Sequence, residues 1–408
     1  GYEILYLWVA RMVMMGLTLM DDIPFSDVFI HGIVRDVKGR KMSKSMGNVI
    51  DPLETIEKYG TDALRFAMAC GGVMGRDVQL SDDNFKAGRN FANKIWNGSR
   101  LVLMNLEGIK LPPSTQATSR SMRERLTLAD RWILDQYNQA IEEVTNAYEE
   151  YDISKAARLL YEFIWSKFCD WYLELAKMRL YGQELSEREV AQFVLIYVLE
   201  GTLKLLHPIM PFITEEVWQL LNHICPASRE ESIMIASWPL PRSEERDGDA
   251  VEKMELVMEV ISQVRNVRSV MRIPHDKMVE VLIKPSKVKQ KAVLDEHILY
   301  IKNLAKSKEV IVDKSLKKPE ECATSVVGDV EIYVPLKGMI DISREVERLS
   351  KEIEEIELEL NGIINKKLKD KEFLTKAPPP VVDKVKKQKE ECETKRDKLL
   401  RNLKLIKE

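Results

Sequence analysis

The sequence predicts a mostly α-helical protein in which part of an α/β domain precedes a helical bundle, a small α+β module and an antiparallel coiled-coil hairpin. Three patterns predict this fold class. Apolar residues recur at intervals of three and four from 84 to 225, as in packed amphipathic helices. Short β-rich runs are grouped between 279 and 334. A heptad repeat begins at Ile342.

The first part of the chain, residues 1–83, combines helix, strand and loop signals. We expect an amphipathic helix over about 3–19 and a short apolar strand over Asp27–Ile30, followed by a glycine-containing loop. Asp51 and Pro52 can begin the next helix as its N-cap and its first residue. Gly60 is expected to end that helix, and a further helix is expected to begin at Thr61.

Breaks in these patterns divide the rest of the chain into three further domains. Helical periodicity predicts a bundle of about five helices over 84–232. Residues 233–340 combine a helix at about 250–271 and another at about 290–304 with the β-rich runs, which indicates a small α+β module. Residues 341–408 contain two heptad-patterned helices. Three consecutive prolines separate these helices, and because a helix cannot continue through them we expect a hairpin.

Composition excludes several classes of protein. The net charge is −3 over 408 residues, so any nucleic-acid contact must come from local basic patches. The five cysteines form no Cys-x-x-Cys pair, which supports neither a structural zinc site nor a disulfide framework. The apolar stretch Leu5–Leu19 contains Arg11, is too short to span a membrane and is not built like a signal peptide. We therefore expect a cytoplasmic, monomeric protein without membrane contact, whose residue 1 is a cut inside a domain.

The loop Lys41–Ser45, which reads Lys-Met-Ser-Lys-Ser, is the most distinctive local motif. It is flanked by Gly39 and Gly47 and lies between a predicted strand and a capped helix. Two lysines three residues apart on such a loop could close on a polyphosphate and stabilise the negative charge that develops there. An ordinary solvated turn would have the same composition, so the motif alone leaves both interpretations open.

Segments around this loop resemble a known family. Together with Lys41–Ser45, the runs His31–Asp36, Met46–Leu53 and Gly60–Arg65 are similar to class I aminoacyl-tRNA synthetases. The resemblance implies the C-terminal part of a Rossmann-like catalytic domain that uses ATP with Mg²⁺. It also implies that Lys44 and Lys41 act on the transferring phosphoryl centre. The ATP-binding residues that it implies are His31, Gly32, Met42, Ser43, Lys44 and Ser45.

The N-terminal helix bears on the amino-acid substrate. The run Ile4–Met12 resembles the valine-specific members of the family rather than those for isoleucine or leucine. Ile4 and Trp8 are four residues apart and would share one helix face. The resemblance implies that they bound a small pocket for the valine side chain, and packing in the protein core is the alternative. The editing domain that the family uses has no counterpart in this sequence.

Two further resemblances make tRNA(Val) the predicted partner. The runs Asn90–Asn97, Phe168–Tyr172 and Leu206–Glu216 are similar to the anticodon-binding bundle of this group, although aromatic residues at helical spacing usually belong to a core. The C-terminal hairpin is typical of the valine-specific members. From 366 to 407 it carries fifteen basic and seven acidic residues, which could hold RNA phosphates or form a solvated coil. The predicted RNA contacts are Lys366, Lys367, Lys369, Lys371, Lys384, Lys386 and Lys387.

The other ATP-binding signature of the family, His-Ile-Gly-His, does not occur in this sequence. We therefore expect a fragment: its parent would form valyl-adenylate and transfer valine to tRNA, whereas this chain alone would not form the adenylate. Two alternatives stay open, a tRNA-binding module without catalysis and a fragment of the isoleucine enzyme. A purely structural coiled-coil protein would leave the Lys41–Ser45 loop unexplained.

Overall fold

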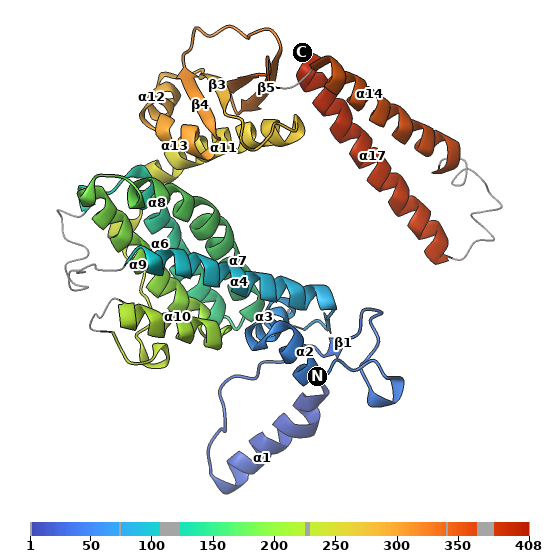
Figure 1. The fold of residues 1–408 in the computed structure, drawn as a ribbon. Coiled ribbons are helices and arrows are strands. Elements are labelled where there is room, and N and C mark those ends of the chain that lie inside the picture. The colour runs from blue at the N-terminus through green and yellow to red at the C-terminus, as the bar shows by residue number, and fades with distance from the viewer. Residues whose placement is uncertain are drawn as a thin grey trace. The chain divides into compact units, whose positions relative to one another are not determined.

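The computed structural model describes residues 2–72, 75–106, 123–224, 229–339, 342–364 and 379–407. It divides into two compact units, 1–251 and 252–408, and each is described here by itself (Figure 1). The first unit is helical except for two short strands, and the second combines a four-stranded sheet with helices. This architecture confirms the predicted fold class.

The first unit begins with a helix that buries none of its residues. A π-helical turn, Leu5–Val9, continues into α1 (Ala10–Leu19). The chain then reaches β1 (Val34–Arg35), which pairs in parallel with β2 (Val78–Gln79). The strand predicted at Asp27–Ile30 is wrong. An apolar run becomes a strand only where a neighbour accepts its backbone hydrogen bonds, and β2 pairs with Val34 and Arg35 instead.

Two short helices follow the Lys41–Ser45 loop, as predicted. Helix α2 (Pro52–Tyr59) begins at Pro52, and the carboxylate of Asp51 accepts a hydrogen bond from the Leu53 amide at 2.8 Å. Gly60, with φ of 96°, separates α2 from α3 (Thr61–Gly71). Their buried side chains form a small core with β2 and the start of the next helix, and this core contains Tyr59, Ala63, Ala67, Val78, Leu80 and Phe85.

A helical bundle makes up most of the first unit. Its elements are α4 (Asp82–Met104), α6 (Leu128–Glu149), α7 (Ile153–Glu162), the π-helical segment Phe163–Tyr172, α8 (Leu173–Leu180), α9 (Leu185–Leu206) and α10 (Pro211–Ile224). The bundle is closed by two short 3₁₀ helices, Ile233–Ile235 and Ser243–Glu245. The largest buried side chains include Trp132, Tyr137, Tyr172 and Trp218.

Two charged residues anchor α3 to this bundle. Asp62 is 7% exposed and accepts hydrogen bonds from the amides of Ile213 and Phe212 at 2.7 and 3.4 Å, at the N-terminus of α10. Burial raises the pKa of Asp62, and these hydrogen bonds oppose that shift. Arg65 donates to the two backbone carbonyls just before α10, both at 2.9 Å. The segment that carries the loop is therefore fastened to the bundle.

The second unit contains the α+β module. Helix α11 (Gly248–Val270) leads into it, and the strands are β3 (Val279–Lys284), β4 (Ser307–Val312), β5 (Cys322–Val327) and β6 (Val330–Pro335). The strand order is β4-β3-β6-β5, with β3 and β4 parallel and the other pairs antiparallel. The sequence did not predict β5, because Cys-Ala-Thr-Ser-Val-Val mixes small and polar residues.

The helix predicted at 290–304 is in fact two helices. Helix α12 (Val288–Glu296) and helix α13 (Ile298–Leu304) meet at His297, whose backbone leaves the helical region at φ −111° and ψ 23°. The Nδ1 atom of His297 lies 2.8 Å from the Val293 carbonyl, which helps to satisfy the end of α12. These two helices form the crossover between the parallel strands β3 and β4.

A helical hairpin ends the second unit, as predicted. Helix α14 (Ile342–Glu359), extended by the π-helical turn Leu360–Ile364, packs along α17 (Pro379–Lys407) (Figure 1). Two polar residues at seam positions of α17 find partners on their own helix: Lys389 lies 3.7 Å from Glu393, and Arg396 lies 2.8 Å from Asp397. The predicted heptad seam supplies the buried core, which contains Leu349, Ile353, Ile356, Leu360, Val385 and Leu399.

Candidate nucleotide site and RNA-binding surfaces

A single carboxylate organises the chain where it enters the Lys41–Ser45 loop. Asp36 is 8% exposed, and it accepts hydrogen bonds from the amide of Arg40 and from its Nε atom, both at 2.8 Å. Gly39, with φ of 74°, completes the tight turn between them. After the turn, Lys41 pairs back with Arg35 of β1. The first residue of the loop is therefore held against the strand.

Asn48 holds the other end of the loop. Its Nδ2 atom donates to the Asp36 carboxylate at 3.0 Å and to the Lys41 carbonyl at 3.3 Å, while its Oδ1 atom accepts from the Ser43 amide at 3.0 Å. The hydrogen bond from Asn48, followed by those from Arg40, holds the pKa of Asp36 well below its usual range. We call this pair the Asp36–Asn48 clasp, because it closes both ends of the loop.

The clasp presents the loop as one exposed turn. Lys41 and Ser45 are exposed, Met42 and Ser43 are half-buried, and the hydroxyls of Ser43 and Ser45 lie 3.2 Å apart. The backbone from Lys44 to Met46 forms a 3₁₀ turn, whereas the side chain of Lys44 lies outside the described part of the structure. Such a turn can meet a phosphate chain, and the catalytic roles of Lys41 and Lys44 stay predictions.

His31 and Gly32 lie at the opposite end of β1, on the wall of an apolar recess of about 400 Å³. The Nδ1 atom of His31 lies 2.8 Å from the Gly32 carbonyl. An apolar recess with a few polar groups suits the faces of an adenine base, so the geometry is compatible with the predicted adenosine contact. The other lining residues are Phe29, Ile33, Val34, Met68, Ala69, Gly72, Val78 and Ile153.

The close approach of another backbone segment also favours glycine at position 32. A Cβ atom at this position would overlap the backbone carbonyl of Arg76, which precedes β2. We expect Gly32→Ala to lower the free energy of unfolding of the chain by about 1–3 kcal/mol, the range for overpacking a tight contact. Chemical denaturation would measure this loss. Gly248→Ala is the matched control, because a Cβ there meets no atom within 4 Å, and an equal loss in both variants would contradict the overlap.

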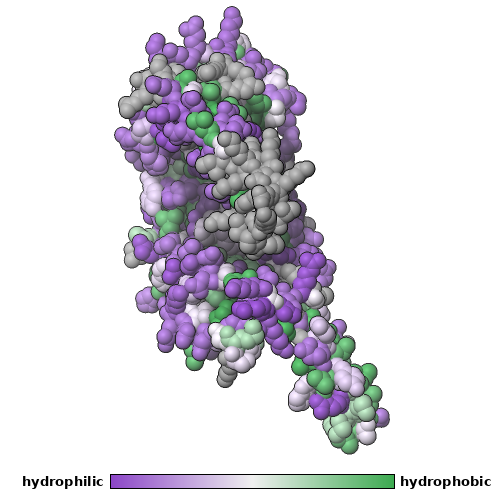
Figure 2. Space-filling view, turned by 90° about the vertical axis from the view of Figure 1, so that its right-hand side faces the viewer, coloured by the Kyte–Doolittle hydropathy of each residue, from purple (hydrophilic) through white to green (hydrophobic). Residues whose placement is uncertain are grey.

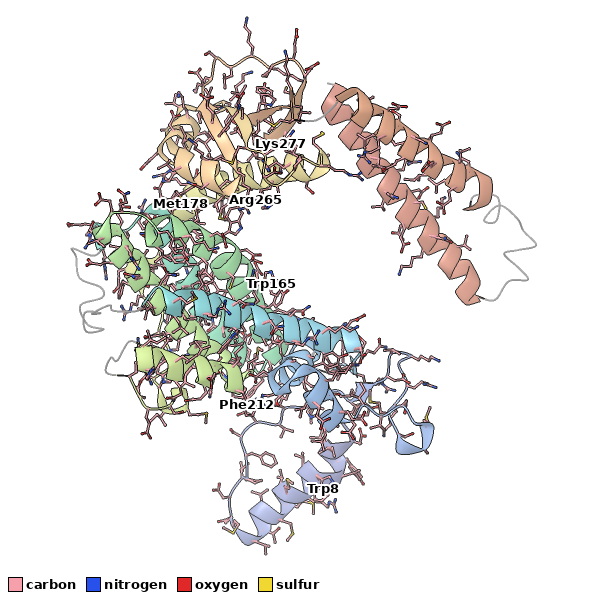
Figure 3. All side chains as sticks on the ribbon, in the orientation of Figure 1. Trp8, Trp165, Met178, Phe212, Arg265 and Lys277 are labelled. Carbon is pink, nitrogen blue, oxygen red and sulfur yellow. The ribbon has the colours of Figure 1, made fainter. Side chains whose placement is uncertain are left out.

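The predicted amino-acid pocket is not assembled within the described residues. Ile4 and Trp8 are 45% and 53% exposed, so the alternative that they pack in the core is wrong for this structure. The guanidinium of Arg11 lies 5.0 Å from the ring centre of Trp8. Hydrophobic side chains are visible at the lower end of Figure 2, where the N-terminal helix lies, and Figure 3 labels Trp8 on it. The pocket role of Ile4 and Trp8 stays a prediction.

A groove of about 440 Å³ runs between α4 and α8 in the bundle. Lys94, Arg100 and Lys177 line it, and the Lys94 ammonium lies 5.1 Å from the ring centre of Trp165, which Figure 3 labels. Two of these cations are paired with carboxylates: Lys94 lies 2.5 Å from Asp170, and Lys177 lies 2.6 Å from Glu174, which also lines the groove. Cations beside an aromatic ring are the usual elements of a surface for single-stranded RNA. The sequence resemblance covered these helices but did not single out this groove.

Only part of the predicted lysine cluster lies in the described part of the C-terminal hairpin. Lys386 and Lys387 are exposed on α17, and Lys387 lies 4.0 Å from Glu391. The backbone of Lys384 belongs to α17, but its side chain is not described. The remaining predicted contacts lie outside the described residues; they are Lys366, Lys367, Lys369 and Lys371.

The described cysteines and acidic side chains bear on metal binding and thiol reactivity. Within the described ranges, no group of three or more His, Cys, Asp or Glu side chains could hold a metal ion. Burial raises the pKa of Cys70 to about 11 and that of Cys169 to about 12, so neither is a thiolate at neutral pH. No helix in the described part of the chain has the length and apolarity that crossing a membrane requires.

Comparison with known families agrees with this geometry. Residues 1–81 match the model of tRNA synthetases class I (I, L, M and V), and residues 130–283 match the anticodon-binding domain of tRNA ligase. Residues 341–407 match the valyl tRNA synthetase tRNA binding arm, which favours the valine branch over the isoleucine alternative. The chain belongs to the class I aminoacyl-tRNA synthetases.

Comparison with individual relatives shows which branch of this family the chain resembles. The chain is 45% identical to the valine–tRNA ligase of Geobacter sulfurreducens over 406 residues, which are 100% of this chain and 45% of that protein. It is 39% identical to that of Bacillus subtilis over 397 residues, 97% of this chain and 44% of that protein. Within its class the chain corresponds to the C-terminal portion of valine–tRNA ligase, as predicted. It spans somewhat less than half the length of these relatives.

Proposed function

We propose that this chain supplies the tRNA-binding parts and the signature loop of a valine–tRNA ligase. In this function the bundle and the C-terminal hairpin hold tRNA(Val). The loop serves the activation of valine by ATP to valyl-adenylate, before valine passes to the 3′ end of the tRNA. The observation that carries the proposal is the Asp36–Asn48 clasp, which holds a dibasic loop in a defined turn directly before the capped helix α2.

The loop and the recess would contact different parts of ATP. Lys41 and Lys44 would stabilise the negative charge on the α-phosphate and on the leaving pyrophosphate, and no covalent enzyme intermediate is required. His31 and Gly32 would line the adenosine. Mg²⁺ bound to ATP would neutralise part of the charge on its phosphates.

The groove between α4 and α8 supports RNA binding by the bundle. Lys94, Arg100 and Lys177 would meet phosphates, and Trp165 offers an aromatic ring next to them. On this proposal the groove contacts the anticodon arm of tRNA, while the exposed lysines of α17 contact another part of the same molecule. Both contacts would be salt-sensitive, since each replaces counterions on the RNA.

A tRNA-binding module without catalysis is the second candidate for the chain as it stands. Ile4 and Trp8, the predicted walls of the valine pocket, are 45% and 53% exposed. Valine-dependent exchange of pyrophosphate into ATP by the isolated chain would decide against this candidate. Tight tRNA binding without such exchange would favour it, and comparison of tRNA(Val) with tRNA(Ile) would test the specificity.

We expect the double variant Lys386→Gln, Lys387→Gln to bind tRNA(Val) more weakly than the parent chain. Each lost phosphate contact should lower the slope of log K against log salt by about 1. A filter-binding or fluorescence titration of tRNA(Val) at several salt concentrations measures this slope. The matched control is Lys351→Gln, an exposed lysine in the acidic helix α14 of the same hairpin. If the control loses as much affinity as the double variant, the assignment of the contact to α17 is wrong.

A further inference from the structure

The second half of α11 and the turn after it form a basic surface that the proposed contacts do not use. The first half of the helix is acidic, with Asp249, Glu252, Glu255 and Glu259. From 260 to 275 the sequence contains no acidic residue at all, and Lys277 and Lys306 lie next to this segment in the fold. We call this surface the α11 basic face, and its cationic or titratable members are Arg265, Arg268, Arg272, His275, Lys277 and Lys306.

Contacts with backbone carbonyls bring these residues together. Arg268 is 8% exposed, and it donates to the carbonyls of Lys306 at 3.3 Å and Pro274 at 3.2 Å. Among its described contacts there is no carboxylate, and burial lowers the pKa of Arg268. The Lys306 ammonium in turn donates to Nδ1 of His275 at 2.6 Å. Three basic side chains thus converge at one corner of the unit.

Acidic side chains near this corner offset part of the charge, and one of them, Glu280 of β3, pairs with Lys308 at 2.7 Å. Arg272 lies 3.8 Å from Glu352 of α14, and Asp276 is exposed beside His275. Lys277 donates to the carbonyl of Met339 at 3.1 Å, so its orientation is set by backbone. Figure 3 labels Arg265 and Lys277 on this unit. Within the described residues, the six cationic or titratable members of the face outnumber these three acidic side chains.

The uncharged residues of the face indicate what it could bind. Ser262, Asn266 and Ser269 are exposed on α11 at helical spacing with Arg265 and Arg272. Between 241 and 277, all of which the structure describes, no large apolar side chain is exposed, and the nearest exposed one on this side is Met278, which is 44% exposed next to Lys277. A protein partner would need an apolar centre in its interface, whereas Arg, Lys, Ser and Asn are the side chains that contact nucleic-acid phosphates and sugars.

The charge pattern of α11 has a simpler explanation that covers only part of it. Acidic residues near the N-terminus and basic residues near the C-terminus complement the helix dipole. This effect explains Arg268 on the last turn of α11, and Arg272 lies just after the end of the helix. It does not explain Lys306, which precedes β4, or Lys277, which precedes β3. Residues from three segments contribute to the face, and no single helix dipole places them together.

We propose that the α11 basic face binds the phosphodiester backbone of RNA, as a contact separate from the lysines of α17 and from the groove between α4 and α8. The proposal rests on the proposed function, since the RNA in question is the tRNA that the chain holds. Lys306 and Arg272 would pair with phosphate oxygens, and Ser262, Asn266 and Ser269 would donate hydrogen bonds to phosphate or ribose oxygens.

Two variants of the intact chain test this contact with tRNA(Val) as the probe. Lys306→Gln should lower the slope of log K against log salt by about 1, the loss expected for one phosphate contact. Ser269→Glu places a carboxylate on the face and should weaken binding several-fold, and it leaves the hydrogen bond from the Arg272 amide to the backbone carbonyl of residue 269 in place. The control is Lys317→Gln. Lys317 follows β4 whereas Lys306 precedes it, and a six-residue strand spans about 20 Å.

The outcomes separate this proposal from the proposed function. Weaker binding by both face variants and a lower slope for Lys306→Gln, with Lys317→Gln unchanged, support the α11 contact. If the parent chain binds tRNA(Val) and both face variants keep its affinity and slope, the α11 contact is wrong while the proposed function stands. If the parent chain does not bind tRNA, the proposed function itself fails. Far-UV circular dichroism of each variant shows whether it has folded.

Discussion

Replacing Asp130 with alanine lowers the free energy of unfolding of the chain by about 3–5 kcal/mol, because it leaves the charge of Arg179 buried without its partner. The side chain of Asp130 is 0% exposed and that of Arg179 is 10% exposed. The guanidinium donates to both carboxylate oxygens, at 2.5 and 2.7 Å. Such a two-pronged pair is the strong form of an ion pair, since both oxygens are satisfied at once.

Two further contacts make Asp130 the centre of the bundle core. The hydroxyl of Tyr172 donates to its Oδ1 atom at 2.6 Å, and the backbone amide and hydroxyl of Thr127 donate to its Oδ2 atom at 2.9 and 2.8 Å. Thr127 and Asp130 therefore form a capping box at the start of α6. Burial raises the pKa of Tyr172 well above its usual range, so this hydroxyl remains a donor.

Chemical denaturation followed by circular dichroism measures the loss. Asp170→Ala is the matched control: Asp170 is also paired, with Lys94 at 2.5 Å, but its side chain is 46% exposed. Exposed ion pairs contribute at most about 1 kcal/mol, so the control should unfold close to the parent chain. Similar losses in the two variants would show that burial does not set the strength of these pairs.

Local patterns in the sequence predicted the elements whose stability depends on near neighbours. The Asp51 cap, the break at Gly60 and the heptad seam through Leu349 and Ile353 were all correct, because each depends on residues within about one helical turn or one heptad. The strand at Asp27–Ile30 was wrong because strand formation depends on a partner far along the chain. An apolar run alone does not reveal where that partner will pair.

The same distinction between near neighbours and distant partners applies to the candidate site. The motif in Lys41–Ser45 drew attention to the loop, but nothing local identified Asp36 as the residue that shapes it. Asn48 is twelve residues from Asp36, and Arg179 is forty-nine residues from Asp130. These pairs join charged or amide side chains whose types are common on any surface. Only the fold shows that they lie together, so spacing rules could not find them.

We expect Asp36→Ala to release the Lys41–Ser45 loop while the bundle stays folded. The carboxylate of Asp36 accepts from the Arg40 amide at 2.8 Å, and Asn48, which it holds, accepts from the Ser43 amide at 3.0 Å. The variant removes the first acceptor and releases Asn48, so both amides should exchange their hydrogens with solvent at least roughly tenfold faster. Hydrogen exchange followed by mass spectrometry or NMR measures the rates.

The same clasp should resist mild acid, because a lowered pKa keeps Asp36 charged until the pH falls below the usual range of an aspartate.

The choice of control separates the clasp from the helix that follows it. Asp51→Ala removes the N-cap of α2, whose carboxylate accepts from the Leu53 amide, and leaves the acceptors of Arg40 and Ser43 in place. It should therefore speed exchange at the start of α2 and not in the loop. Asn48→Ala should release the Ser43 amide but keep the turn at Arg40, because Asp36 holds that turn directly. If Asp36→Ala and Asp51→Ala release the same amides, the loop is ordered by α2 rather than by the clasp. In that case the lysines of the loop depend on the helix cap for their position before a phosphate.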